Sequence, residues 1–337
     1  METGALAKLV RDAAMKLYDF CNYPAAQYKI LFHFLDTPYD DEKLTALRPA
    51  FHNSDIVEEL HQEQDYNGGW GRLDHKDYDA KDKFPCSLVA IRRCLYIGLT
   101  IEDRDILLMA YEYLESFLKG TSKEKLYNKN ERAIPWQKAT ICEAIESIQP
   151  HNPLCDNTYA DWLYIVSRAY GGGEYSYEKD KAAQHEVFLT REQRLVPMQF
   201  GLLLKRRDKL PPELECALLR HHGQHAYDNG HFWDKNLHSF PENFKNPQTR
   251  RWFHTLEYIN QFHGSAVFLE KAVDWLVENQ GTDGLWNYGG QTNDPWGYYE
   301  YFSTGKKDNF NRIVNCTVKV LGFLKAYLNH NEGASDV

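Results

Sequence analysis

Apolar residues return at three- and four-residue steps along most of the chain, which is the spacing of one face of an α-helix. Clusters of Gly, Pro, Asn and Asp separate these stretches and are typical of turns. No strong run of alternating β-branched residues interrupts the helical pattern. The sequence therefore predicts an all-α protein, with its clearest helices at residues 101–119, 157–170, 191–207, 211–226, 248–262, 265–279 and 311–328.

One pattern occurs twice, as DIVEELHQEQDYNGGW at residues 55–70 and as KAVDWLVENQGTDGLW at residues 271–286. At one constant offset the two copies share Val, Leu, Gln, Gly and Trp, and both fit Q-x-x-x-G-x-W. Each copy predicts a helix that ends near the Gln, a glycine turn, and a Trp that folds back onto the helix end. Glycine permits the positive φ of such a turn, and Trp supplies a large apolar ring with one donor.

A polar loop and a further helix follow each copy, with CSLVAIRRCLYIGL from residue 86 and NRIVNCTVKVLGFL from residue 311. This arrangement resembles the repeats of the terpenoid cyclase and protein prenyltransferase superfamily, over roughly residues 50–330 by spacing. The resemblance implies an (α/α) toroid of inner and outer helices around a central cavity. It would form a single domain over residues 1–337, with N-terminal helices in residues 1–64 packing on or completing the ring. The repeated Gln and Trp point to the fold rather than to the chemistry.

Composition narrows the class of protein. The chain has 337 residues and a formal net charge of −9, which disfavours a general nucleic-acid binder. Seven cysteines without a C-x-x-C pair indicate free thiols in a reducing compartment. Residues 1–20 predict an amphipathic helix without the apolar core of a signal peptide, and no stretch is apolar for long enough to span a membrane. We therefore expect a cytoplasmic protein with no membrane span.

The segment PLCDNT at residues 153–158 holds the best catalytic candidates. It is similar to the Asp-rich segment that opens an inner helix in triterpene and class II diterpene cyclases, where an Asp protonates an alkene or epoxide. The resemblance places Asp156 at that Asp, whereas Leu154 and Asn157 stand where the family has further acids. Asp156 and Asn157 are therefore the predicted catalytic residues. Asp, Asn and Thr before an apolar run also form ordinary helix caps, and that reading stays open.

Cationic and aromatic side chains supply the candidates for substrate binding. Arginines near the starts of predicted inner helices could bind a diphosphate or carboxylate, because the guanidinium group forms bidentate hydrogen bonds with such groups. Aromatic rings could stabilise a carbocation by cation–π attraction or stack on a sugar. Ion pairs and ordinary packing are the alternatives. The candidates are Arg92, Arg250, Arg251, His254, Trp162, Trp296, Tyr298 and Tyr299.

The leading interpretation is a terpenoid-cyclase-like enzyme that cyclises or isomerises an isoprenoid by protonation, in an aromatic-lined cavity. Its substrate would be small, apolar and able to carry an anionic group. We expect no cofactor, with Mg²⁺ needed only for a diphosphate substrate. We also predict no metal site, although His221 and His225 have a spacing that suits zinc.

Two further functions and one assembly stay open. A carbohydrate-active hydrolase or lyase could use Asp294 and Glu300 together with Asp156. A toroid of this kind could instead bind a ligand without catalysis. The chain could also form a homodimer.

Overall fold

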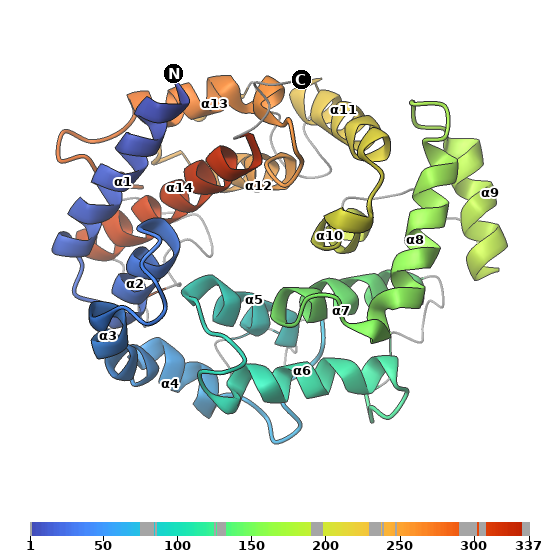
Figure 1. Cartoon of the computed structure of the whole chain (residues 1–337), viewed down its shortest axis with the longest axis horizontal. Helices are drawn as coiled ribbons and strands as arrows, with labels where there is room; N and C mark the ends of the chain where they lie inside the picture. The colour runs from blue at the N-terminus through green and yellow to red at the C-terminus, as the bar shows by residue number, and fades with distance from the viewer. Residues whose placement is uncertain are drawn as a thin grey trace. The chain divides into compact units, whose positions relative to one another are not determined.

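The computed structural model describes residues 2–74, 84, 86–124, 126, 133–189, 198–228, 237, 239–246, 248–289, 302 and 308–331. Within these residues every regular element is a helix and none is a strand (Figure 1), which confirms the all-α prediction for this part of the chain. The helices are α1 (Thr3–Phe20), α2 (Pro24–Lys29), the π-helical turn η1 (Ile30–Phe34), α3 (Glu42–His52), α4 (Asp55–Gln62), α5 (Ser87–Ile97), α6 (Asp105–Leu118), α7 (Ile134–Ile148), the 3₁₀ turn η3 (Pro153–Cys155), α8 (Asp156–Ala169), α9 (Tyr177–Phe188), α10 (Met198–Lys205), the 3₁₀ turn η4 (Arg207–Lys209), α11 (Pro212–Asp228), α12 (Thr249–Ile259), α13 (Ala266–Glu278) and α14 (Asn309–Asn331).

The predicted helices correspond to α6, α8 and α10 to α14, with ends that shift by a few residues. The helix expected at residues 191–207 is described only from Met198 onward. Helices α7 and α9 were not among those predicted. In the described part of the chain, no helix has both the length and the apolarity needed to cross a membrane.

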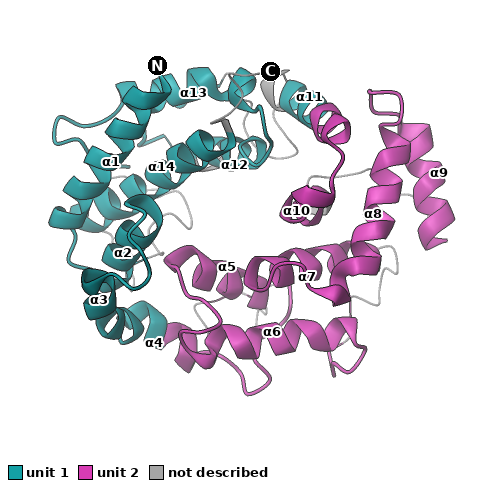
Figure 2. Ribbon diagram, viewed as in Figure 1, with its two compact units in different colours: residues 1–58, 219–337 teal, residues 59–218 magenta. Residues whose placement is uncertain are grey.

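Contacts divide the chain into two compact units (Figure 2). Unit 1 comprises residues 1–58 and 219–337, and unit 2 comprises residues 59–218. The boundaries fall inside α4 and α11. Each unit therefore has its own core and is described separately.

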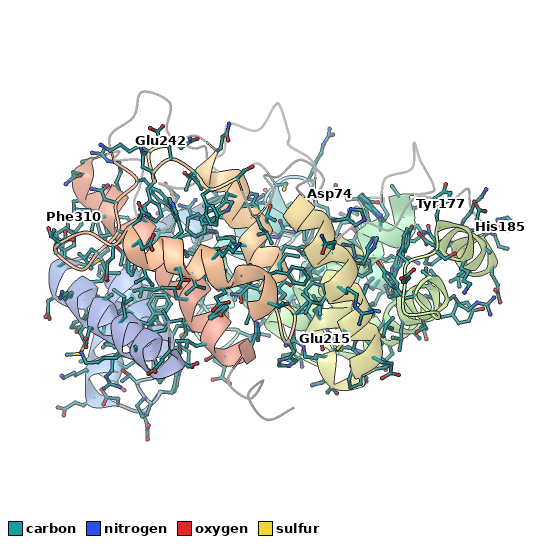
Figure 3. All side chains as sticks on the ribbon, turned by 90° about the horizontal axis from the view of Figure 1, so that it is seen from above. Asp74, Tyr177, His185, Glu215, Glu242 and Phe310 are labelled. Carbon is teal, nitrogen blue, oxygen red and sulfur yellow. The ribbon has the colours of Figure 1, made fainter. Side chains whose placement is uncertain are left out.

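In unit 1 the N-terminal helix is amphipathic, as predicted, and packs against α14. Leu6, Val10 and Leu17 lie buried on one face of α1. At its end, Phe20 stacks on Phe310 of α14, with ring centroids 5.0 Å apart (Figure 3). Helix α13 packs against both α12 and α14, so that an apolar core lies between these helices.

Unit 2 has α7 at its centre, because α5, α6, α8 and α10 all contact this helix. Helix α9 lies beside α8 at the edge of the unit (Figure 1). Residues Ile141, Cys142 and Ile145 make up the buried face of α7. Helix α7 therefore brings together side chains from most of the helices of this unit.

The first Q-x-x-x-G-x-W copy forms a compact turn in unit 2, which we call the first QW turn (residues 64–70). Gln64 Nε2 donates to the backbone oxygen of Gly68 at 2.9 Å, and Gly68 has a φ of 88°. Trp70 is buried, and its Nε1 donates to the backbone oxygen of Leu60 at 2.9 Å. The backbone N–H of Trp70 donates to Ser87 Oγ at the start of α5 at 2.8 Å. The Trp thus folds back onto the helix end, as predicted.

The second QW turn (residues 280–286) repeats this geometry in unit 1. Gln280 Nε2 donates to the backbone oxygen of Gly284 at 2.8 Å, and Gly284 has a φ of 80°. Trp286 Nε1 donates to the backbone oxygen of Leu276 at 2.7 Å. The backbone N–H of Trp286 donates to Thr317 Oγ1 in α14 at 2.9 Å. Each turn therefore connects an earlier helix to a later one through a hydroxyl group.

Candidate functional site

The predicted acid motif lies where η3 leads into α8. Asn152 precedes it and caps η3, because its Oδ1 accepts a hydrogen bond from the N–H of Leu154 at 3.0 Å. Asp156 is in the first turn of α8, and 56% of its side chain is exposed. Asn157 is also exposed. Both predicted catalytic residues thus lie at an exposed helix start.

Asp156 is held by Arg206, which is fully buried just after α10. Arg206 Nη1 donates to Asp156 Oδ1 at 2.5 Å, and Nη2 donates to Glu146 Oε1 of α7 at 2.6 Å and to the backbone oxygen of Asn152. Glu146 is also buried and accepts from the backbone N–H groups of His151 and Asn152, at 2.8 and 3.0 Å. A buried guanidinium is stable only when its charge and donors are matched, and this network supplies the match.

A second ion pair continues the same region of unit 2. Arg207, the first residue of η4, donates from Nε to Glu215 Oε1 of α11 at 3.0 Å (Figure 3). Together, Arg206 and Arg207 connect the segment after α10 to α7, α8 and α11. The cluster therefore fixes how these helices meet.

The environment of Asp156 favours its charged form. The hydrogen bond from Arg206 lowers the pKa of this carboxyl more than desolvation raises it, and the charges of Arg206 and Lys209 also lower it. A carboxyl group with a lowered pKa is a carboxylate at neutral pH, which accepts protons rather than donating them. This geometry supports a role for Asp156 in the ion pair at the helix start better than a role as proton donor.

A different acid occupies a pocket of unit 2. The pocket has a volume of about 50 Å³ and lies between α5 and α7. On each helix the lining residues repeat at three- and four-residue steps, so that each helix contributes one face. The pocket is lined by Leu88, Ile91, Arg92, Leu95, Thr140, Glu143, Ala144 and Ser147.

Glu143 is the only acid among the residues that line this pocket. Its carboxyl group lies against Gly201 of α10, where a side chain larger than that of glycine would collide with it. Burial raises the pKa of Glu143, while the positive charges of Arg92 and Lys205 oppose the rise. Although part of its surface stays accessible, the carboxyl is closely surrounded by protein atoms, which disfavours the charged form. Glu143 is thus a carboxylic acid that retains its proton to a higher pH than usual.

Glu143 was not among the residues predicted from the sequence, although one signal was present. Glu143 interrupts an apolar stretch, ATICEAIESI, within a helical pattern. An acid on such a face is either paired or functional. Its neighbours on α5 and α10 are distant in the sequence, so only the fold could show that it lines a pocket.

The other predicted substrate-binding residues are distributed over both units. Arg92 lines the pocket beside Glu143. Trp162 of α8 is buried against Phe188 of α9, with ring centroids 5.2 Å apart, and belongs to the core of unit 2. His254 is exposed on α12 of unit 1. Arg250 and Arg251 are in α12, but their side chains are outside the described part, as are Trp296, Tyr298 and Tyr299.

Unit 1 contains a separate group of basic residues around η1. Lys319 Nζ of α14 pairs with Glu257 Oε1 of α12 at 2.6 Å. Burial lowers the pKa of Lys29 to about 7, and the charge of Lys319 contributes to this shift. Burial, with the charge of Lys29, lowers the pKa of His33 to about 4. By accessible surface, Lys29 is half-buried and His33 is exposed.

Comparison of the chain with protein-family models, with curated proteins and with solved structures finds no match. Among the described residues, no group of three or more His, Cys, Asp and Glu side chains is arranged to hold a metal ion. The rings of His221 and His225 do lie together, with centroids 4.5 Å apart. The function must therefore be argued from the two QW turns and the pocket.

Proposed function

We propose that this protein is a terpenoid-cyclase-like enzyme that cyclises or isomerises an isoprenoid substrate by protonating it, with Glu143 as the proton donor. In this proposal the two units together form an (α/α) toroid. The observation that carries the proposed chemistry is a carboxyl group whose pKa is raised by burial, in a small pocket next to one arginine.

The two QW turns support the proposed class of fold. They lie in different units, and in each the Gln, the Gly and the Trp have the same roles. A motif that recurs at a distance and builds the same turn is typical of an architecture made of repeated helix pairs. The family that the motif resembles uses such turns between inner and outer helices. Because fold alone does not define function, the chemistry needs separate support.

That support comes from Glu143. Protonation of an alkene or epoxide requires an acid that still has its proton at the working pH. Burial of the Glu143 carboxyl favours this state, because it disfavours ionisation and raises the pKa. Asp156 has the opposite environment, since Arg206 stabilises its carboxylate. The acid role therefore moves from Asp156 to Glu143 in this proposal.

The size of the pocket limits how a substrate could bind. A volume of about 50 Å³ has room for a few water molecules, so only the reacting end of an isoprenoid would enter it. The side chains of Leu88, Ile91 and Leu95 would contact that end. Arg92 could bind an anionic group, and Mg²⁺ would be needed only if that group is a diphosphate.

A product screen by mass spectrometry tests this function. Wild type, Glu143→Gln and Asp156→Asn would be incubated with prenyl diphosphates of graded length and with squalene, with and without Mg²⁺. We expect wild type to convert one substrate to an isomer or cyclised product, and Glu143→Gln to be at least about 100-fold slower. Asp156→Asn, if folded by circular dichroism, should stay within about threefold of the wild-type rate, since Glu143 is unchanged and Arg206 keeps Glu146 and the backbone oxygen of Asn152 as partners.

Other outcomes would point elsewhere. Loss of activity in folded Asp156→Asn, with Glu143→Gln as active as wild type, would return the acid role to Asp156. Release of diphosphate at the first step would indicate ionisation rather than protonation. An absence of turnover with every isoprenoid would overturn the proposal and favour a ligand-binding or carbohydrate-active protein.

A further inference from the structure

Two buried cysteines of unit 2 are in contact. Cys142 is on α7, and Cys155 is the last residue of η3. Neither has accessible surface. Cys155 Sγ lies 3.9 Å from the backbone oxygen of Cys142, and each of the two thiols influences the pKa of the other. The fold thus brings together two sulfur atoms that the spacing of the cysteines did not suggest as a pair.

We propose that Cys142 and Cys155 form a reversible disulfide when the protein meets a hydroperoxide such as hydrogen peroxide. The proposal is independent of the proposed enzymatic function. It assigns a redox modification site to the start of α8, where the sequence had indicated a catalytic motif.

The reaction consumes one peroxide for each disulfide. The sulfur of Cys142, as thiolate, attacks one peroxide oxygen; the O–O bond breaks, and the other oxygen leaves as water after it takes up a proton. Cys142 is then a sulfenic acid. The sulfur of Cys155 attacks the sulfur of Cys142, the S–S bond forms, and the hydroxyl group leaves as a second water with the thiol proton. The two sulfurs lose two electrons in all, and the peroxide gains them.

The surroundings give the two sulfurs different roles. Hydrogen bonds from Cys155 and Thr158 and the nearby charge of Arg206 lower the pKa of Cys142. The pKa of Cys155 is raised, first by its contact with Cys142 and then by burial. Cys142 is therefore the sulfur that loses its proton first and reacts, and Cys155 is the thiol that resolves the intermediate.

Two other buried cysteines provide internal controls. Cys94 and Cys316 are as inaccessible as the pair, and burial raises the pKa of both thiols. A thiol in such surroundings is inert. If solvent accessibility alone set the rate of oxidation, all four cysteines would react at similar rates. The proposed chemistry instead requires Cys142 and Cys155 to react first.

The test is peroxide treatment of the folded wild-type protein, followed by denaturation, alkylation and mass spectrometry. Trypsin leaves both cysteines in one peptide, residues 139–168. A disulfide lowers the mass of this peptide by two hydrogen atoms and prevents its alkylation. Further cleavage after Glu143 or Glu146 gives two peptides that stay joined until dithiothreitol reduces them. We expect this product to form at least about ten-fold faster than Cys94 and Cys316 lose their thiols.

Variants confirm the pairing. Cys142→Ser and Cys155→Ser should each abolish the joined peptides, and Cys94→Ser should leave them unchanged. The wild-type result decides the question even if a variant fails to fold. Full alkylation of both cysteines after treatment, a disulfide to another cysteine, or sulfinic acid at Cys142 without a disulfide would each overturn the proposal.

Discussion

The two QW turns have the same internal hydrogen bonds but different surroundings. In the first, Gln64 also donates to the backbone oxygen of Ile106 in α6 at 2.9 Å, and Gly68 lies against the backbone of Met109 in the same helix. In the second, Gly284 lies against the flexible side chain of Lys16. The shared sequence thus specifies the turn itself, whereas the neighbouring helix decides how much change the turn tolerates.

Replacing the tryptophans should cause the largest loss of stability, and this loss should be similar for both turns. Trp70→Ala and Trp286→Ala each remove a fully buried ring and its hydrogen bond. We expect each to lower the free energy of unfolding by about 3–5 kcal/mol. Urea denaturation measures the loss, and hydrogen exchange locates it in unit 2 for Trp70 and in unit 1 for Trp286. A loss in only one of the two would show that the turns are not equivalent.

Replacing the glycine should destabilise the protein more in the first QW turn than in the second. Both have positive φ, so Gly→Ala costs about 1 kcal/mol from backbone strain at either position. At Gly68 the new methyl group would also collide with the Met109 carbonyl, which cannot move without shifting α6. At Gly284 the side chain of Lys16 can move away. Gly68→Ala should therefore destabilise by about 3 kcal/mol and Gly284→Ala by about 1 kcal/mol. Equal urea midpoints for the two variants would contradict this account.

Removing the hydroxyl group of Ser87 or of Thr317 should give a smaller difference in stability between the two turns. Ser87 and Thr317 are both buried and accept from the Trp backbone N–H. Thr317 also donates to the backbone oxygen of Trp286 at 3.1 Å. Ser87→Ala should cost about 1–2 kcal/mol, and Thr317→Val about 1 kcal/mol more, because it leaves a second polar group unmatched. Urea denaturation of the two variants measures both losses in the free energy of unfolding. A larger loss for Ser87→Ala than for Thr317→Val would contradict this expectation.

Lys29 of unit 1 should make the stability of this unit depend on pH. The pKa of Lys29 falls from 10.5 to about 7 on folding. Between these values the unfolded chain binds more protons, so this residue makes stability rise as pH increases above about 7. Lys29→Met should flatten the slope of melting temperature against pH between pH 7 and about 9. An unchanged slope would show that Lys29 is not the group responsible.

Sequence patterns predicted the parts of this fold that depend on local contacts. The QW turns were predictable because a Gln, a Gly and a Trp within a few residues determine them. Helix α9 was not, because its buried face combines Ala183 with the polar residues Asp180 and Gln184. Asp180 is fully buried in it and is matched by Tyr175 and Gln184, each at 2.6 Å. An apolar periodicity cannot reveal a helix of this kind.

The candidate site was predicted less well for a related reason. Asp156 was identified from its local segment, but its partner Arg206 is far away in the sequence. That pairing lowers the pKa of Asp156, whereas a proton donor needs a raised pKa. Glu143 gains its raised pKa from burial beneath α10 and beside α5, which no local pattern contains. Residue types thus indicated acidic candidates, whereas the surroundings that distinguish Asp156 from Glu143 depend on residues far apart in the sequence.

The most direct test of the central claim, that Glu143 donates a proton to the substrate, is turnover in D₂O. The substrate found in the screen would be incubated with wild type, Glu143→Gln and Asp156→Asn, and the deuterium in the product would be located by mass spectrometry and NMR. We expect one solvent deuteron bound to carbon at the initiation site in the product of wild type and of Asp156→Asn, and no such product with Glu143→Gln. Product without deuterium, or labelled product made as fast by Glu143→Gln as by wild type, would contradict it.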